Sequence, residues 1–159
     1  MIVTLLKSIL FFFLVPVLLL GFLPWRLASM NMPLFDAGLL RYFAFLLWLA
    51  GAVIELWCFW NFTLQGRGTP APIDPPKELV AVGLYRYVRN PMYVAGILAL
   101  LGWLIWSPSL PLILAPFVFF LATHLFVTLY EEPHLRKLFG QSYESYLQKV
   151  PRWIPKFRN

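Results

Sequence analysis

The chain alternates between long apolar runs and shorter polar segments rich in proline and charge. The apolar runs span residues 8–25, 39–64, 91–106 and 112–130. About 20 consecutive apolar residues suffice to cross the hydrocarbon core of a membrane as a helix. The pattern therefore predicts an all-α, polytopic membrane helix bundle of about four transmembrane helices.

Two of these runs leave alternatives open. Residues 8–25 resemble a signal peptide, but no small-x-small cleavage site follows them, so we predict a retained transmembrane helix. Residues 91–106 are short for a full crossing. With residues 112–130 they form either two crossings or a hairpin buried from one side; both arrangements place the segments around Gly83 and the C-terminal tail on one face.

The polar segments predict loops and surface helices. Residues 65–82 are too rich in proline and glycine for a helix, so we expect a long loop. In the tail, apolar residues recur at helical spacing on both sides of a stop at Gly140, which predicts one or two interfacial amphipathic helices. Pro133 predicts a kink or break where the last apolar run leaves the membrane.

Composition narrows the class of protein. Of 159 residues 60% are hydrophobic and 13% charged, which indicates a single membrane domain over residues 1–159. In so apolar a chain, the net charge of +6 indicates that basic residues orient the helices in the membrane and contact lipid headgroups. No nucleic acid partner is expected. Only Arg26 and Arg41 fall on the side opposite the other basic residues, so that more basic side is predicted to be cytoplasmic. Cys58 lies within an apolar run, and His124 and His134 are too few to predict a metal site.

The segment from Gly83 to Gly96 combines basic residues with a helix start. Asn90 is a favoured N-cap and Pro91 a favoured first helical residue, so a helix is expected to begin there. Its free N–H groups and Arg89 would together attract an anion such as a carboxylate or phosphate. Gly96 would lie on the same face of this helix as the residues of its first turn, where the lack of a side chain lets another group approach closely. Alternatively, the arginines of this segment are only anchors at the membrane surface.

Acidic residues supply the opposite charge. Glu131 and Glu132 leave the last apolar run on the same side as Arg89, and His124 shares a helix face with Glu131. These groups predict a site for a small zwitterion beside lipid, although a structural salt bridge and a hydrogen-bonded core histidine remain alternatives. Glu55, a carboxylate within an apolar helix, is a functional candidate or a buried structural residue.

Two motifs carry a family resemblance. The first is Gly83-Leu-Tyr-x-x-Val-Arg-Asn-Pro-Met-Tyr-x-x-Gly96, and the second runs from Glu131-Glu132 through Phe139-Gly140-x-x-Tyr143-x-x-Tyr146 to Val150-Pro151-Arg152-x-Ile154-Pro155. Together they closely resemble the isoprenylcysteine carboxyl methyltransferase and phospholipid methyltransferase family of membrane enzymes. The resemblance covers about residues 79–155, roughly half the chain.

The resemblance implies a methyltransferase that depends on S-adenosylmethionine. It implies that the cofactor is bound by Tyr85, Arg89, Asn90, Pro91, Tyr93, Gly96, Glu131 and Glu132. Candidate catalytic residues are Arg89, Glu132, Glu55 and His124. The eukaryotic carboxyl methyltransferases usually have histidine where this chain has Asn90, and an amide is not a base at neutral pH.

The methyl acceptor is expected to be lipophilic and to enter between the helices. A prenylcysteine-type carboxylate would need no base, whereas a lipid amine would need one such as Glu55, His124 or a glutamate at the membrane exit. Two other classes stay open. A non-catalytic lipid-binding or scaffold protein would bind no cofactor, and a sterol-reductase-like enzyme would bind a reduced nicotinamide. The oligomeric state is left open.

Overall fold

The computed structural model describes residues 16–30, 34–61 and 78–156, and this part of the chain is helical without any strand. Its elements are, in order, η1 (Val17–Phe22), α2 (Leu23–Ser29), η2 (Gly38–Tyr42), α3 (Phe43–Asn61), η4 (Gly83–Arg86), α4 (Pro91–Trp106), α5 (Leu110–Phe126), η5 (Val127–Glu131), α6 (Glu132–Phe139) and α7 (Gln141–Lys149). η1 and η5 are π-helical, whereas η2 and η4 are 3₁₀ turns.

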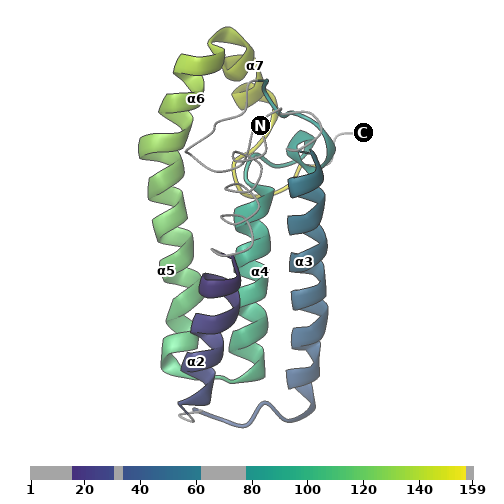
Figure 1. The fold of residues 1–159 in the computed structure, drawn as a ribbon, viewed down its shortest axis with the longest axis vertical. Helices are drawn as coiled ribbons and strands as arrows, with labels where there is room; N and C mark the ends of the chain where they lie inside the picture. Colours follow the sequence, from purple (N-terminus) through teal and green to yellow (C-terminus); the bar gives the residue numbers. More distant parts are fainter. Residues whose placement is uncertain (1–15, 31–33, 62–77, 157–159) are drawn as a thin grey trace, which may run out of the picture.

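The helices α2 to α5 lie side by side along the long axis of the molecule (Figure 1). α4 is the central helix, since it packs against α2, α3 and α5. α6 continues from α5, and α7 turns back across the end of the bundle where α4 begins (Figure 1). One end of the bundle thus carries the polar motifs, and the other carries the connection between α4 and α5.

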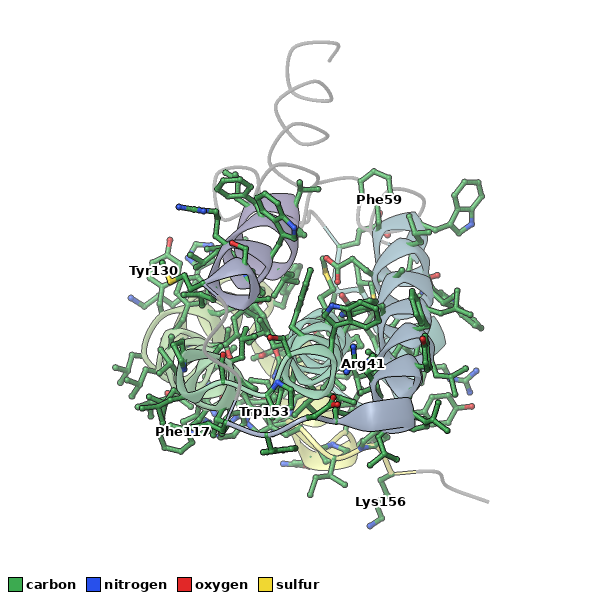
Figure 2. All side chains as sticks on the ribbon, turned by 90° about the horizontal axis from the view of Figure 1, so that it is seen from below. Arg41, Phe59, Phe117, Tyr130, Trp153 and Lys156 are labelled. Atoms are coloured by element: carbon green, nitrogen blue, oxygen red, sulfur yellow. The ribbon has the colours of Figure 1, made fainter. Side chains whose placement is uncertain are left out.

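The outer surface of the bundle is apolar. Phe117 on α5, Leu46 on α3 and Trp60 near the end of α3 are 64%, 59% and 62% exposed, and Phe117 points outward in Figure 2. Such extensive exposed apolar surface is not stable in water, but it suits lipid. Within the described residues, two helical segments are long and apolar enough to cross a membrane, Gly38–Asn61 and Leu110–Phe139.

The predicted helices match the structure where it describes them. α4 begins at Pro91 and ends at Trp106 as predicted, and the tail forms two helices that separate at Gly140. The first helix continues past Trp25 to Ser29. The start of that run, residues 8–15, and most of the predicted loop, residues 62–77, lie outside the described residues.

The sequence predicts a kink or break at Pro133, and the break is wrong, because the helix continues through this residue. Glu132, which precedes the proline, keeps helical angles of φ −62° and ψ −44°. The helix accommodates the ring through η5, where the N–H of Glu132 donates to the carbonyl of Val127, five residues earlier. A π-turn widens the helix just where a proline would otherwise collide with the preceding turn, so the chain stays helical.

Gly83 illustrates how tightly the polar end is packed. Its φ is +55°, and an added Cβ would lie within 3.0 Å of the Asn61 side-chain amide nitrogen. We expect Gly83→Ala to lower the free energy of unfolding by about 2 kcal/mol, from the positive φ and the collision together. Gly38→Ala is the matched control, because Gly38 has a φ of +53° but open space around it. Thermal unfolding in detergent should separate the two variants; equal losses would contradict the collision.

Candidate functional site

A buried carboxylate, Glu132, lies at the centre of an ion-pair network. Its Oε1 accepts a hydrogen bond from Arg89 Nη1 at 2.8 Å and another from Arg152 Nε at 2.8 Å. Its Oε2 accepts from Arg152 Nη2 at 2.9 Å. The side chain of Glu132 is 5% exposed, while those of Arg89 and Arg152 are 14% and 30% exposed. Two cations therefore share one buried anion, which leaves net positive charge at this point.

Three distant segments come together to form this network. Arg89 lies in the turn before α4, Glu132 begins α6, and Arg152 follows α7. The backbone holds them in place, because the N–H of Arg89 donates to the carbonyl of Pro151 at 2.9 Å. Tyr146 adds a further link, since its hydroxyl donates to the carbonyl of Tyr85 at 2.7 Å. The tail is therefore fastened over the start of α4.

Asn90 occupies the N-cap position of α4, but the predicted cap by its side chain is wrong. Its Nδ2 instead donates to the carbonyl of Arg152 at 3.1 Å, and the side chain makes no cap hydrogen bond. The amide thus joins the tail to the helix start. The first N–H groups of a helix have no partner within that helix, and Asn90 does not cap those of α4, so this helix start is a candidate to bind an anion.

The second acid, Glu131, faces α4. Its Oε2 accepts a hydrogen bond from the hydroxyl of Tyr93 at 3.1 Å. Tyr85 is 6% exposed in the neighbouring turn η4. Burial raises the pKa of the Tyr85 phenol, and nearby Cys58, Glu131 and Glu55 act in the same direction. The two candidate carboxylates, Glu131 and Glu55, therefore lie within electrostatic reach of the same tyrosine.

His124 lies beside the network and already has a partner. Its Nδ1 accepts a hydrogen bond from Trp153 Nε1 at 3.1 Å, and the Phe120 and Trp153 rings lie 5.8 Å and 6.0 Å from its ring. This contact agrees with the alternative in which His124 is a structural histidine, hydrogen-bonded to a neighbour. Gly96 faces α5 at short range, since an added Cβ would lie 2.8 Å from the ring of Phe119. Its position is explained by helix packing.

Several neighbours of the network were absent from the sequence-based candidates: Tyr143, Tyr146, Arg152 and Trp153. Tyr143 is 3% exposed. Burial raises the pKa of its hydroxyl, and the charges of Glu132 and Glu131 raise it further, so the group stays protonated as a donor. The second motif could have identified these neighbours, because it contains all of them except Trp153 at fixed positions.

Some hydrogen-bonding capacity at the site is not used within the described residues. Arg89 Nε is buried and has no partner among them. The hydrogen bonds from Arg152 and Arg89 occupy both oxygens of Glu132. Within the described residues, the hydrogen bond from Tyr93 occupies only Oε2 of Glu131. A buried donor without a partner is costly, so this position suits an incoming acceptor. The arrangement can hold a molecule that carries both a negative and a positive group.

Such a bundle, with a paired-charge site at one end and an apolar outer surface, defines an all-helical protein built to work on or beside lipid. Residues 39–142 match the family model described as phospholipid methyltransferase. The chain belongs to this family.

The curated relatives agree with this assignment. The chain is 38% identical over 84 residues to the protein-S-isoprenylcysteine O-methyltransferase of Schizosaccharomyces pombe, covering 48% of this chain and 33% of that protein. It is 31% identical over 100 residues to the phosphatidylethanolamine N-methyltransferase of Eremothecium gossypii, covering 59% and 11%. A protein of Haemophilus influenzae without an assigned function is 36% identical over 63 residues, which are 40% of this chain and all of that protein.

The chain thus spans about a third of the first of these enzymes and about a tenth of the second. No solved structure matches the chain.

Proposed function

We propose that this protein transfers a methyl group from S-adenosylmethionine to a lipophilic acceptor at the cytoplasmic face of a membrane. The acceptor is a prenylcysteine-type carboxylate or a lipid amine, the two classes named for the relatives. In this proposal four helices cross the membrane: the predicted helix of residues 8–25, of which η1 and the start of α2 are the described part, and α3, α4 and α5. The basic residues around α4's start and in the tail favour the cytoplasmic side for that end of the bundle.

The observation that carries the proposal is the network around Glu132. It joins the two sequence motifs at one buried point, through contacts of 2.8 Å to Arg89 and 2.8 Å to Arg152. A buried ion pair is costly to form, so it is weak support for stability alone. Its position beside the uncapped start of α4 and the second acid, Glu131, favours a role in binding.

The residues present fit the cofactor. S-adenosylmethionine would supply a methyl group on a positively charged sulfur, which is its own leaving group. In our proposal the free Nε–H of Arg89 and the first N–H groups of α4 bind its carboxylate. Glu131, held by Tyr93, binds the ammonium group. Pro91, Tyr85 and Asn90 fix the start of α4 and the turn before it, and Gly96 lets α5 pack close to α4 beside this site.

The acceptor determines which further residues are needed. A carboxylate acceptor already carries the lone pair that the transfer needs, so it would require no residue of this chain to remove a proton. An ammonium must first lose its proton before the nitrogen lone pair can attack. In the amine case we assign that proton to Glu55, which lies within electrostatic reach of Tyr85, rather than to the already bonded His124.

Transfer of labelled methyl from S-adenosylmethionine into a total lipid extract tests the proposal. Label in a phospholipid headgroup would identify an amine acceptor, and base-labile label in an added prenylcysteine analogue would identify a carboxylate. Protein that binds S-adenosylhomocysteine but labels nothing would contradict the proposed acceptors. Protein that binds no such compound would favour a lipid-binding scaffold, and binding of reduced nicotinamide would favour the sterol-reductase class.

Glu55→Gln separates the two kinds of acceptor. With an amine acceptor, we expect kcat to fall by a factor on the order of 100, because the amide cannot take the proton. With a carboxylate acceptor, kcat should stay within about twofold, since no proton leaves that acceptor. Glu144→Gln, in an exposed pair on α7, is the control and should change neither reaction. Affinity for S-adenosylhomocysteine measures whether the cofactor site is intact in both variants.

A further inference from the structure

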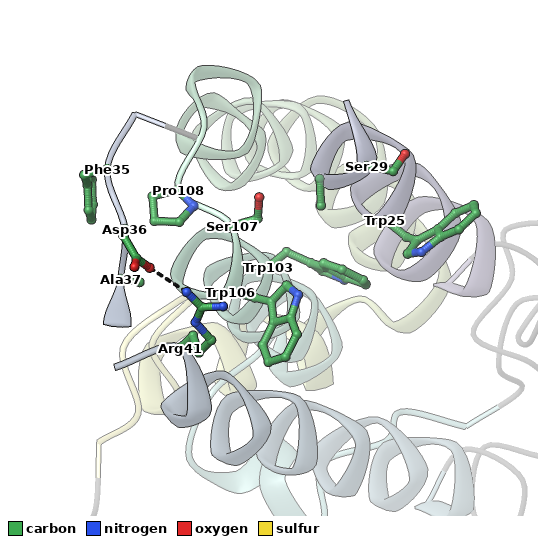
Figure 3. A pocket seen from close by; sticks show the side chains of 11 residues that line it. Trp25, Ser29, Phe35, Asp36, Ala37, Arg41, Trp103, Trp106, Ser107 and Pro108 are labelled. Atoms are coloured by element: carbon green, nitrogen blue, oxygen red, sulfur yellow. Dashed lines mark hydrogen bonds and ion pairs between the residues drawn. The ribbon is translucent and has the colours of Figure 1, made fainter. Parts of the chain in front are cut away.

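A pocket of about 430 Å³ lies at the opposite end of the bundle from the Glu132 network. It is lined by residues of α2, of η2 and the segment before it, of the end of α4 and of the turn between α4 and α5, among them Trp25, Asp36, Arg41, Trp103, Trp106 and Ser107 (Figure 3). α4 runs from one site to the other, and its 16 residues correspond to a rise of about 24 Å. This distance approaches the thickness of a hydrocarbon core, so the pocket would lie near the other membrane interface.

The walls of the pocket are held in place by their own contacts. Trp103 Nε1 donates to the carbonyl of Leu20 at 2.8 Å, and the Trp103 ring lies 4.9 Å from that of Trp48. Trp106 packs against Trp48 at 5.8 Å and edge-on against Phe45 at 5.6 Å. The N–H of Leu34 donates to the carbonyl of Pro108 at 2.7 Å, which ties the segment before η2 to the α4–α5 turn. The pocket therefore exists before any ligand arrives.

Both signs of charge meet in this pocket. Arg41 Nη2 donates to Asp36 Oδ1, and Arg41 Nε donates to the carbonyl of Gly38 at 3.0 Å. A guanidinium has five N–H groups, so three of them have no partner among the described residues. Asp36 is held ionised, because the Gly38 N–H and Arg41 lower the pKa of its carboxyl. Its Oδ2 makes no hydrogen bond within the part of the chain that the structure describes.

The chemistry of these groups indicates one kind of ligand. Arg41 and Ser107 both line the pocket, and the free N–H groups of an arginine suit the oxygens of a phosphate. The Oδ2 of Asp36 suits an ammonium group, and the tryptophan rings of the same pocket can add cation–π attraction. The surroundings suit acyl chains, since the neighbouring Leu39 and Leu40 are 85% and 73% exposed. A molecule with phosphate, ammonium and apolar chains in that order is a zwitterionic phospholipid.

We propose that this pocket binds the headgroup of a zwitterionic phospholipid, with its phosphate on Arg41 and Ser107 and its ammonium on the Oδ2 of Asp36. The site is separate from the proposed methyl-transfer site and does not depend on it. A lipid held here would fix the bundle against the far interface, where tryptophan side chains are favoured.

Calorimetric titration of the purified protein in detergent tests the proposal. The probes are short-chain phosphatidylethanolamine, short-chain phosphatidylglycerol and inorganic phosphate. We expect the phosphatidylethanolamine to bind most tightly and Arg41→Gln to weaken it about tenfold, because charge-assisted hydrogen bonds are lost. Asp36→Asn should weaken phosphatidylethanolamine but not phosphatidylglycerol. Arg41→Lys should keep part of the affinity, which guards against a variant that is merely misfolded.

Arg26→Gln is the matched control, because Arg26 is an exposed arginine on α2 that does not line the pocket. The proposal fails if the Arg41 and Arg26 variants bind equally well. It also fails if phosphatidylglycerol or phosphate alone binds as tightly as phosphatidylethanolamine. Arg89→Ala should leave this binding unchanged, and Arg41→Gln should leave affinity for S-adenosylhomocysteine unchanged. Failure here is therefore distinguishable from failure of the methyltransferase proposal.

Discussion

Replacing Glu132 with alanine is expected to lower the free energy of unfolding by about 3–5 kcal/mol, the cost of breaking a buried pair from one side. The change removes the shared anion from Arg89 and Arg152, which then lie close together as two uncompensated cations. The tail would lose its main side-chain link to the start of α4, so the proposed cofactor site should be lost as well. Thermal unfolding in detergent measures the first effect, and titration with S-adenosylhomocysteine the second.

The exposed pair between Arg136 and Glu144 provides the matched control. Its contact is equally short, at 2.8 Å, but the two side chains are 48% and 43% exposed. Glu144→Ala should therefore change the free energy of unfolding by no more than about 1 kcal/mol. Glu132→Gln keeps the shape of the side chain and removes only its charge. If Glu132→Ala and Glu144→Ala were equally stable, the network would have no structural importance.

Replacing Arg89 with alanine is expected to weaken binding of S-adenosylhomocysteine at least tenfold, since a hydrogen bond to a charged group contributes about 1.5–3 kcal/mol. The variant should still fold, because Glu132 keeps both of its hydrogen bonds to Arg152. Binding is best measured by calorimetric titration in detergent, well below the unfolding temperature of the variant.

Arg86→Ala serves as the control for Arg89→Ala. Arg86 lies three residues earlier in the same basic segment, but its side chain is exposed. The two variants lose the same charge from the same face, so a general effect on the membrane surface would weaken binding equally in both. A specific site predicts that only the Arg89 variant is affected. Unchanged affinity in the Arg89 variant would contradict the assigned role.

The parts of the fold that the sequence predicted correctly depend on local signals. The start of α4 follows from Pro91 alone, because proline favours the first helical turn, and the separation of α6 from α7 follows from Gly140, whose φ is +52°. Pro133 carried an equally strong local signal, yet its predicted break is wrong. A π-turn can absorb a proline, and no residue type marks such a turn in the sequence.

The sequence predicted the site only to the extent that its residues could be assigned to one side of the membrane. Arg89, Glu131 and Glu132 were expected on the same side of the membrane, and the structure brings Arg89 and Glu132 into contact. The sequence did not reveal that Arg152 would be the second partner, because that contact spans 20 residues and depends on how α7 folds back. For the same reason Asn90 was assigned to the helix start, whereas its amide bonds to the tail.

In the wide turn η5, the number of residues should matter more than the identity of their side chains. Leu129 and Tyr130 within it are 74% and 50% exposed, so substitutions there should cost little. Deleting either residue would convert η5 to an ordinary α-helical turn, in which the ring of Pro133 collides with the preceding turn. The helix would then kink or break at the paired acids, which would displace the acids and the tail from α4. A point deletion in this stretch should therefore be far more damaging than any single replacement within it.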